Sequence, residues 1–138
     1  MLALTVNSSG YRVLGLLHIL SAVVAFGPLF LYPGLRKAGE TVTIARMHMR
    51  LTLPALVALW VFGMGLAGMS DGVFEMSQTW LVLSLLDWVV LVAVSWFLIR
   101  PALQDPSASA TSKLMAGTGV THLGLVIGLF LMIWKPGL

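Results

Sequence analysis

The sequence predicts an all-α membrane protein: a four-helix transmembrane bundle with both chain termini on the non-cytoplasmic side. Three observations favour this fold class. Hydrophobic residues make up 59% of the 138-residue chain, charged residues make up only 9%, and the apolar residues lie in four long runs. Soluble domains carry about 25% charged residues, so this composition cannot provide a water-facing surface. The length allows one domain, which we place over residues 1–138.

Each apolar run is close to the roughly 20 residues that a membrane-spanning helix needs. Their continuous apolar character favours helices over barrel strands, which alternate in polarity over about 10 residues. The first run is too long for the apolar region of a cleavable signal peptide. Kinks are expected at Pro28 and Pro54, because each proline ring clashes with the carbonyl group four residues earlier. The predicted helices are residues 13–32, 51–69, 80–99 and 114–134.

The distribution of basic residues predicts the orientation in the membrane. Six basic residues fall in the loops 33–50 and 100–113, against two on the opposite side. Because cytoplasmic loops carry an excess of Lys and Arg, we assign both loops to the cytoplasm. Residues 41–50 contain no Gly or Pro and could extend the second helix. The candidate contacts with anionic lipid headgroups are Arg36, Lys37, Arg46 and Arg50.

The composition also limits the chemistry of the chain. The absence of cysteine excludes disulfides, thiolate metal sites and cysteine nucleophiles. There is no basic patch on a folded polar face, so nucleic acid is not an expected partner. The sequence contains no G-x-S-x-G, no H-E-x-x-H and no phosphate-binding glycine loop. We therefore expect the lipid bilayer as the main partner and favour a protein that is not an enzyme.

Three ionisable residues, His18, Asp87 and His122, fall inside the predicted spans. Such residues are costly in lipid, so they usually face the bundle interior and often serve function. The helical rise places His18 roughly 8 Å and Asp87 roughly 10 Å below the outer ends of their helices. These similar depths allow a contact between the two residues. His122 lies deeper, roughly 18 Å from the end of its helix.

Three interpretations of these residues remain open. In the first, the three residues form a hydrogen-bonded core cluster that sets the register of the helices. In the second they form a b-type haem or porphyrin site, and in the third a path for protons or ions. In the haem interpretation, His18 or His122 is the axial ligand and Asp87 orients an imidazole. The difference in depth argues against one haem held by both histidines.

Met47, His48 and Met49 form a separate candidate metal site at the cytoplasmic face. Thioether and imidazole ligands suit copper(I). On a helix, however, residues two positions apart diverge, so Met47 and Met49 would not converge on one ion. The alternative is an interfacial stretch in which flexible methionine side chains pack loosely.

Three segments resemble a bacterial family of four-span integral membrane proteins of unknown function. They are LLHILSAVVAFGPLFLYP in the first helix, RMHMRLTLPALVALWVFGMGLA at the start of the second, and FLMIWKP at the end of the fourth. The resemblance covers residues 11–136 and implies a location in the bacterial inner (plasma) membrane. More distantly, the first half of the chain is similar to HemJ-type protoporphyrinogen oxidases and to CopD-type copper-resistance membrane proteins.

The distant resemblance implies that His18 matches a haem-linked histidine of the HemJ-type enzymes. It also implies that Arg50, Leu51 and Pro54 match the start of their second helix. Those enzymes carry a lysine early in the third helix, just after a Trp-Leu pair. In this chain Trp-Leu at 80–81 is followed by Val-Leu-Ser, without a lysine in the span. The missing lysine argues against porphyrinogen oxidation and leaves haem binding without that activity as an open alternative.

Two hypotheses of function follow from the sequence. The first is a non-catalytic accessory subunit or self-associating bundle, partnered by a larger membrane complex or by its own copies through stripes of small residues. The second is a membrane redox protein that binds haem b or a porphyrin through His18, supported by Asp87 or His122. The stripes are Gly15, Ala22 and Ala25, then Gly63, Gly65 and Gly68, and finally Gly117, Thr121, Gly124 and Gly128.

Overall fold

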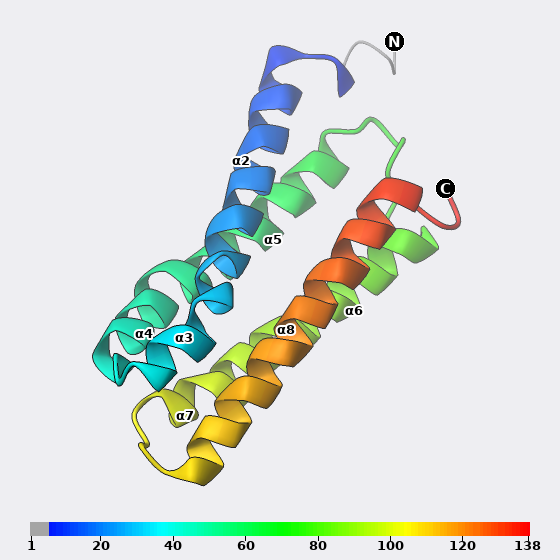
Figure 1. The fold of residues 1–138 in the computed structure, drawn as a ribbon. Coiled ribbons are helices and arrows are strands. Elements are labelled where there is room, and N and C mark those ends of the chain that lie inside the picture. Colours follow the sequence, from blue (N-terminus) through cyan, green and yellow to red (C-terminus); the bar gives the residue numbers. More distant parts are fainter. Residues whose placement is uncertain (1–5) are drawn as a thin grey trace.

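The computed structural model describes residues 6–138, and this part of the chain is helical without strands. Four helical segments are long and apolar enough to cross a membrane, which confirms an all-α fold with four candidate spans. The start of the first segment and the end of the fourth lie at the same end of the bundle (Figure 1). The segments are Ser9–Lys37, Thr41–Gly68, Thr79–Leu103 and Ala108–Trp134.

All four segments extend beyond the apolar runs that predicted them, because polar residues continue the helices past the apolar region. The largest difference is in the loop predicted at 33–50, whose first part, residues 33–37, is helical and was wrongly predicted as loop. Only a short turn through Gly39, with φ of 80°, separates the first two segments. The elements around this turn are α3 (Tyr32–Lys37) and α4 (Thr41–Met47), so the predicted extension of the second helix is confirmed.

Proline residues explain the irregular turns within the segments. Pro28 ends α2 (Ser9–Phe26) and begins the 3₁₀ turn η1 (Pro28–Phe30), as the expected clash with a preceding carbonyl requires. Two π-helical turns, η2 (His48–Thr52) and η3 (Val94–Ile99), end two residues before Pro54 and Pro101. A π turn is wider than an α turn, so it leaves room for the proline ring. The distortions at Pro28 and Pro54 were predicted, whereas the one at Pro101 was not.

The helices associate as two pairs. One pair is α2 with α5 (Leu53–Gly68), and the other is α6 (Thr79–Ala93) with α8 (Ala108–Trp134). The pairs meet mainly at the end of the bundle that holds α3, α4 and α7 (Arg100–Leu103), and they separate toward the chain termini (Figure 1). We call these the closed end and the open end. The buried core, which includes Leu29, Ile44, Ile99 and Leu114, lies largely at the closed end.

Small residues allow the close approach of helices within each pair. A Cβ atom added at Gly117 would lie 2.6 Å from Ile99 Cγ1, and one added at Gly124 would lie 2.6 Å from Leu91 Cδ2. A Cβ atom added at Gly65 would likewise lie 2.9 Å from Leu14 Cδ2. The small-residue stripes therefore pack largely inside this chain, which removes much of their support for self-association.

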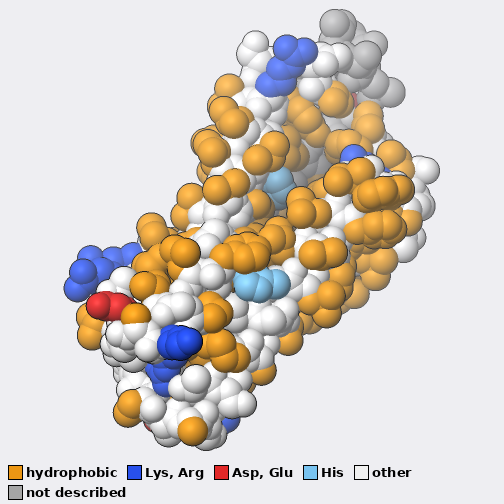
Figure 2. All heavy atoms as spheres, in the orientation of Figure 1, with side chains coloured by type: hydrophobic (Ala, Val, Ile, Leu, Met, Phe, Trp, Pro, Cys, Tyr) orange, Lys and Arg blue, Asp and Glu red, His pale blue; other side chains and the backbone are white. Residues whose placement is uncertain are grey.

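The exterior of the bundle is apolar along the spans. Large hydrophobic side chains such as Phe97 and Ile133 are 76% and 67% exposed. Figure 2 shows hydrophobic side chains over the middle of the visible face, with Lys and Arg side chains toward its ends. A surface of this kind is stable against acyl chains rather than water, so the fold is that of a multi-pass membrane protein.

At the closed end, Ser107 begins α8 as its N-cap. Its Oγ atom accepts a hydrogen bond from the Ala110 amide at 3.1 Å. Replacing Ser107 by alanine should lower the free energy of unfolding by about 1 kcal/mol, because one amide of the first turn loses its acceptor. The measurement is an SDS titration of the protein in mild detergent. Ser112→Ala is the control, since this exposed serine caps no helix. Equal stability of the two variants would contradict the capping role.

Candidate functional site

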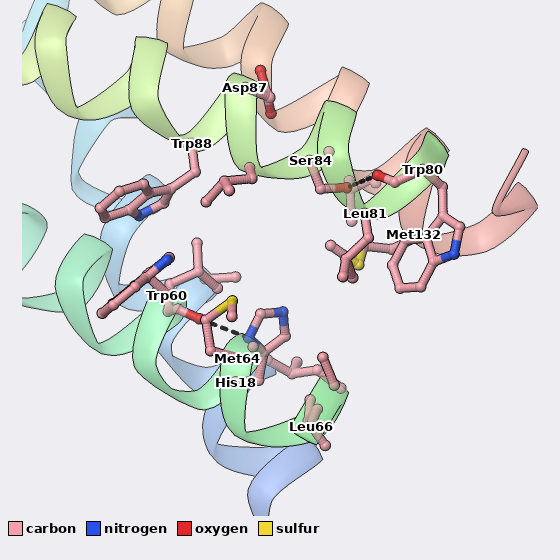
Figure 3. Close-up of a pocket in the computed structure, with 18 of the residues that line it drawn as sticks. His18, Trp60, Met64, Leu66, Trp80, Leu81, Ser84, Asp87, Trp88 and Met132 are labelled. Atoms are coloured by element: carbon pink, nitrogen blue, oxygen red, sulfur yellow. Dashed lines mark hydrogen bonds between the residues drawn. The ribbon is translucent and has the colours of Figure 1, made fainter. Parts of the chain in front are cut away.

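A cavity of about 520 Å³ lies between the two helix pairs. Its volume falls within the roughly 300–1,000 Å³ that is common for ligand and cofactor sites. The walls are mainly aliphatic and aromatic side chains, and the charged or titratable residues that line it are Tyr11, His18, Asp87 and Lys135. The close-up of this cavity shows side chains from both helix pairs facing the space between them (Figure 3).

His18 projects from α2 into this cavity. Its Nδ1 atom lies 2.9 Å from the backbone carbonyl oxygen of Leu59 on α5 (Figure 3). A carbonyl oxygen only accepts, so Nδ1 carries the proton and donates it, and Nε2 holds a free lone pair. Gly63 makes this position available, since a Cβ atom there would lie 2.9 Å from His18 Cε1. Metal-binding histidines commonly have this arrangement, in which one ring nitrogen donates to a carbonyl and the other is left for the metal.

Asp87 lies on α6, in the wall opposite to His18, and points away from His18 in Figure 3. Its carboxylate faces two glycines of α8. Cβ atoms added at Gly124 and Gly128 would lie 3.1 and 3.3 Å from its oxygen atoms. Among residues 6–138, no hydrogen bond or ion pair joins Asp87 to His18. The contact that the similar depths allowed is not formed, because α2 and α6 belong to different pairs that diverge toward the open end.

His122 is separated from the other two ionisable residues. Its ring stacks on Phe30 of η1, with centroids 4.1 Å apart and an interplanar angle of 18°. Its Nε2 atom is buried and has no hydrogen-bond partner within the described residues. His122 does not line the cavity. The reason is helical rotation: Gly124 faces the cavity, and a residue two positions away on a helix points in a different direction.

His48 lies in the core of the closed end, with 0% of its surface exposed. Its Nε2 atom donates to the Ser95 carbonyl at 3.0 Å, so its Nδ1 atom accepts from the Tyr32 hydroxyl at 3.1 Å. The Tyr32 oxygen in turn accepts from Thr52 Oγ1 at 3.0 Å. Three of the four segments therefore meet in one hydrogen-bonded network at this imidazole.

This network bears directly on the predicted copper site. Both ring nitrogens of His48 are engaged, so none is left for a metal ion in this arrangement. Met47 packs against the core, whereas Met49 is 40% exposed. The described part of the chain also holds no cluster of three or more His, Asp or Glu residues that could bind a metal ion. His48 is buried inside the bundle, where its polar atoms are satisfied by Tyr32 and by the Ser95 carbonyl.

Of the four basic residues predicted to contact lipid headgroups, Arg36 has a different position. Its side chain is only 9% exposed. The guanidinium donates to Thr111 Oγ1 at 3.1 Å, to the Ala102 carbonyl at 3.3 Å and to the Asp105 carbonyl. The prediction that Arg36 contacts lipid headgroups is therefore wrong. Its side chain joins α3 to the end of α7 and the start of α8. The other three residues, Lys37, Arg46 and Arg50, are exposed.

The loop bound by Arg36 has one perturbed acidic group. The backbone amide of Ser107 donates to Asp105 Oδ1 at 2.8 Å. This hydrogen bond stabilises the carboxylate form and lowers the pKa of Asp105 below its ordinary value. Asp105 is therefore ionised at neutral pH.

Several residues of the cavity were not predicted from the sequence. Trp60 on α5 and Trp88 on α6 belong to its lining and stack on each other, with ring centroids 5.6 Å apart (Figure 3). Trp88 also donates to the Leu56 carbonyl at 2.8 Å, which links α6 to α5. Both tryptophans lie inside a span rather than at its end, and this unusual position was the available signal. Lys135 was also missed, because it follows the fourth apolar run and looked like an ordinary flanking charge.

The fold and the site define the chain as a four-helix membrane bundle with an apolar cavity that contains one histidine. Comparisons with known protein families, curated proteins and solved structures found no match. Its function must therefore be inferred from the cavity itself.

Proposed function

We propose that this chain is a protein of the bacterial inner membrane that binds haem b or a related porphyrin in its cavity, with His18 as the axial ligand. The observation that carries the proposal is the hydrogen bond from His18 Nδ1 to the Leu59 carbonyl, which leaves Nε2 free at the cavity. This bond sets both the tautomer and the orientation of the ring before a ligand arrives.

The residues of the cavity fit a porphyrin. The volume of about 520 Å³ and the apolar walls suit a large, flat, hydrophobic ligand. The stacked pair of Trp60 and Trp88 adds aromatic surface to the lining, and most of the other lining side chains are aliphatic. His122 lies outside the cavity, so a single imidazole ligand is expected rather than two. When bound, haem would supply one-electron transfer chemistry.

The second candidate is a non-catalytic accessory subunit or self-associating bundle. The observation that favours it is the weak contact between the two helix pairs toward the open end, where an apolar cavity lies between them. A helix of a larger complex, or of a second copy, could bury these walls. The internal packing of Gly65, Gly117 and Gly124 makes this candidate the weaker of the two.

The proposed orientation places the closed end in the cytoplasm. It rests on the excess of basic residues in the two connections at that end. The exposed side chains of Lys37, Arg46 and Arg50 would then meet the anionic lipid of the inner leaflet, as predicted.

The absorption spectrum and native mass of the protein, purified in mild detergent from haem-replete cells, test both candidates. We expect a Soret band and one haem per chain, because the cavity provides one free imidazole nitrogen. A colourless protein that also fails to bind added haemin would contradict the proposal. A colourless protein that purifies with larger partners, or as an oligomer of its own chain, would instead support the second candidate.

A further inference from the structure

Lys135 is the basic residue that lines the cavity, and it lies at the open end. It directly follows α8, whose last residue is Trp134. Its ammonium group lies 5.8 Å from the ring centroid of Trp80 and 5.9 Å from that of Phe74. The cavity therefore has a cation above aromatic rings at one end, and beyond it a mainly apolar interior that also contains His18 and Asp87.

The backbone holds Lys135 at this point. Its φ of 43° is in the left-handed region, which a residue with a side chain adopts only at a steric cost. Helices commonly end with glycine at such a position. The next residue, Pro136, accepts a hydrogen bond from the Trp80 amide at 3.1 Å, so the end of the chain is attached to the start of α6. Backbone strain of this kind often accompanies function.

The lining residues change in polarity along the cavity. Tyr11 and Lys135 lie at the open end, at the start of α2 and just after α8. Phe26 and Leu91, which are buried core residues, lie toward the closed end. A ligand that matches this gradient is an amphiphile with an anionic group at one end and a flat apolar body.

On the basis of the proposed function, we infer that the ligand is a porphyrin with free carboxylate groups, held with these groups at the open end, where Lys135 binds them. The ammonium forms charge-assisted hydrogen bonds to carboxylate, which are stronger than bonds between neutral groups. His18 would hold the iron of the bound group through its free Nε2 atom inside the cavity. Lys135 thereby makes the cavity bind acidic porphyrins more tightly than neutral ones.

Lys135 also donates a hydrogen bond to the Met132 carbonyl at 2.7 Å, so its ammonium group stabilises the C-terminal turn of α8 as well. A purely structural role would affect protein stability and the binding of every ligand equally. The two roles are therefore separable by comparing a charged ligand with its neutral ester.

The experiment compares the binding of haemin and of haemin dimethyl ester to the detergent-solubilised apoprotein, by absorption titration. We expect the wild type to bind haemin about tenfold more tightly than the ester, as one charge-assisted bond allows. In Lys135→Asn this preference should disappear through weaker binding of haemin alone. Asparagine tolerates the left-handed backbone, so the helix end is kept. Lys135→Arg should retain the preference.

Lys113→Asn is the matched control, because Lys113 is exposed near the other end of α8 and does not line the cavity. It should behave as the wild type. Equal binding of haemin and ester by the wild type, or equal weakening of both by Lys135→Asn, would overturn the role of Lys135 and leave haem binding intact. If neither porphyrin binds the wild type, the proposed function falls together with this inference.

Discussion

Replacement of His18 by alanine is expected to remove the Soret band of the haem-loaded protein. The variant loses the nitrogen that would ligate the iron, and the cavity offers no other imidazole. Loss of a partner that only orients a metal ligand typically weakens binding by roughly 10- to 100-fold, so loss of the ligand itself should exceed that range. The measurement is a haemin titration of the purified variant, followed by absorption.

His122→Ala is the control for this prediction. Like His18, His122 has a ring nitrogen without a hydrogen-bond partner among the described residues, but His122 lies outside the cavity. We expect this variant to retain the Soret band. Added imidazole should partly restore the band in His18→Ala, because the shortened side chain leaves space next to Gly63. A normal band in His18→Ala would contradict the assignment of the axial ligand.

Replacement of Arg36 by alanine is expected to have the largest effect on stability. Its guanidinium makes three hydrogen bonds from a buried position, and each hydrogen bond of a charged group contributes about 1.5–3 kcal/mol. Because water can reach the freed carbonyls at the end of the bundle, we expect a net loss of about 2–4 kcal/mol in the free energy of unfolding. The measurement is an SDS titration in mild detergent.

Lys37→Ala provides the comparison, since this neighbouring residue is exposed and its loss should change stability by less than about 0.5 kcal/mol. Arg36→Lys should be intermediate, because one ammonium cannot reproduce the fork of donors that contacts three oxygens. If Arg36→Ala proves as stable as Lys37→Ala, the guanidinium would not connect α3 to the α7–α8 loop in the way we describe.

The two predictions concern opposite ends of the bundle, which differ in construction. The closed end is joined by the bonds of Arg36 and by the network of Tyr32, His48 and Thr52. The open end contains the cavity, and there the helix pairs have few contacts with each other. A firmly joined end supports the two helix pairs, so that His18 and Asp87 line opposite walls of the cavity without meeting. This division is typical of a scaffold that leaves space for a ligand.

The sequence by itself determined the fold class and the number of candidate spans. Hydrophobicity is a local property, so a run of apolar residues shows where the bilayer favours a helix wherever its neighbours lie. The same is true of Pro28 and Pro54, whose rings disturb their own helices. The proposal of His18 as a ligand also began from the sequence, with its position inside a span and with the resemblance.

Only the tertiary structure decided which polar residues share a site. Whether His122 faces the cavity or Phe30 depends on the rotation of α8 against its neighbours, and that rotation is set by contacts such as Gly124 with Leu91. The same holds for Arg36, which the sequence placed against lipid and which finds its acceptors on α7 and α8. Long-range contacts fix the direction of each side chain, and no local pattern records them.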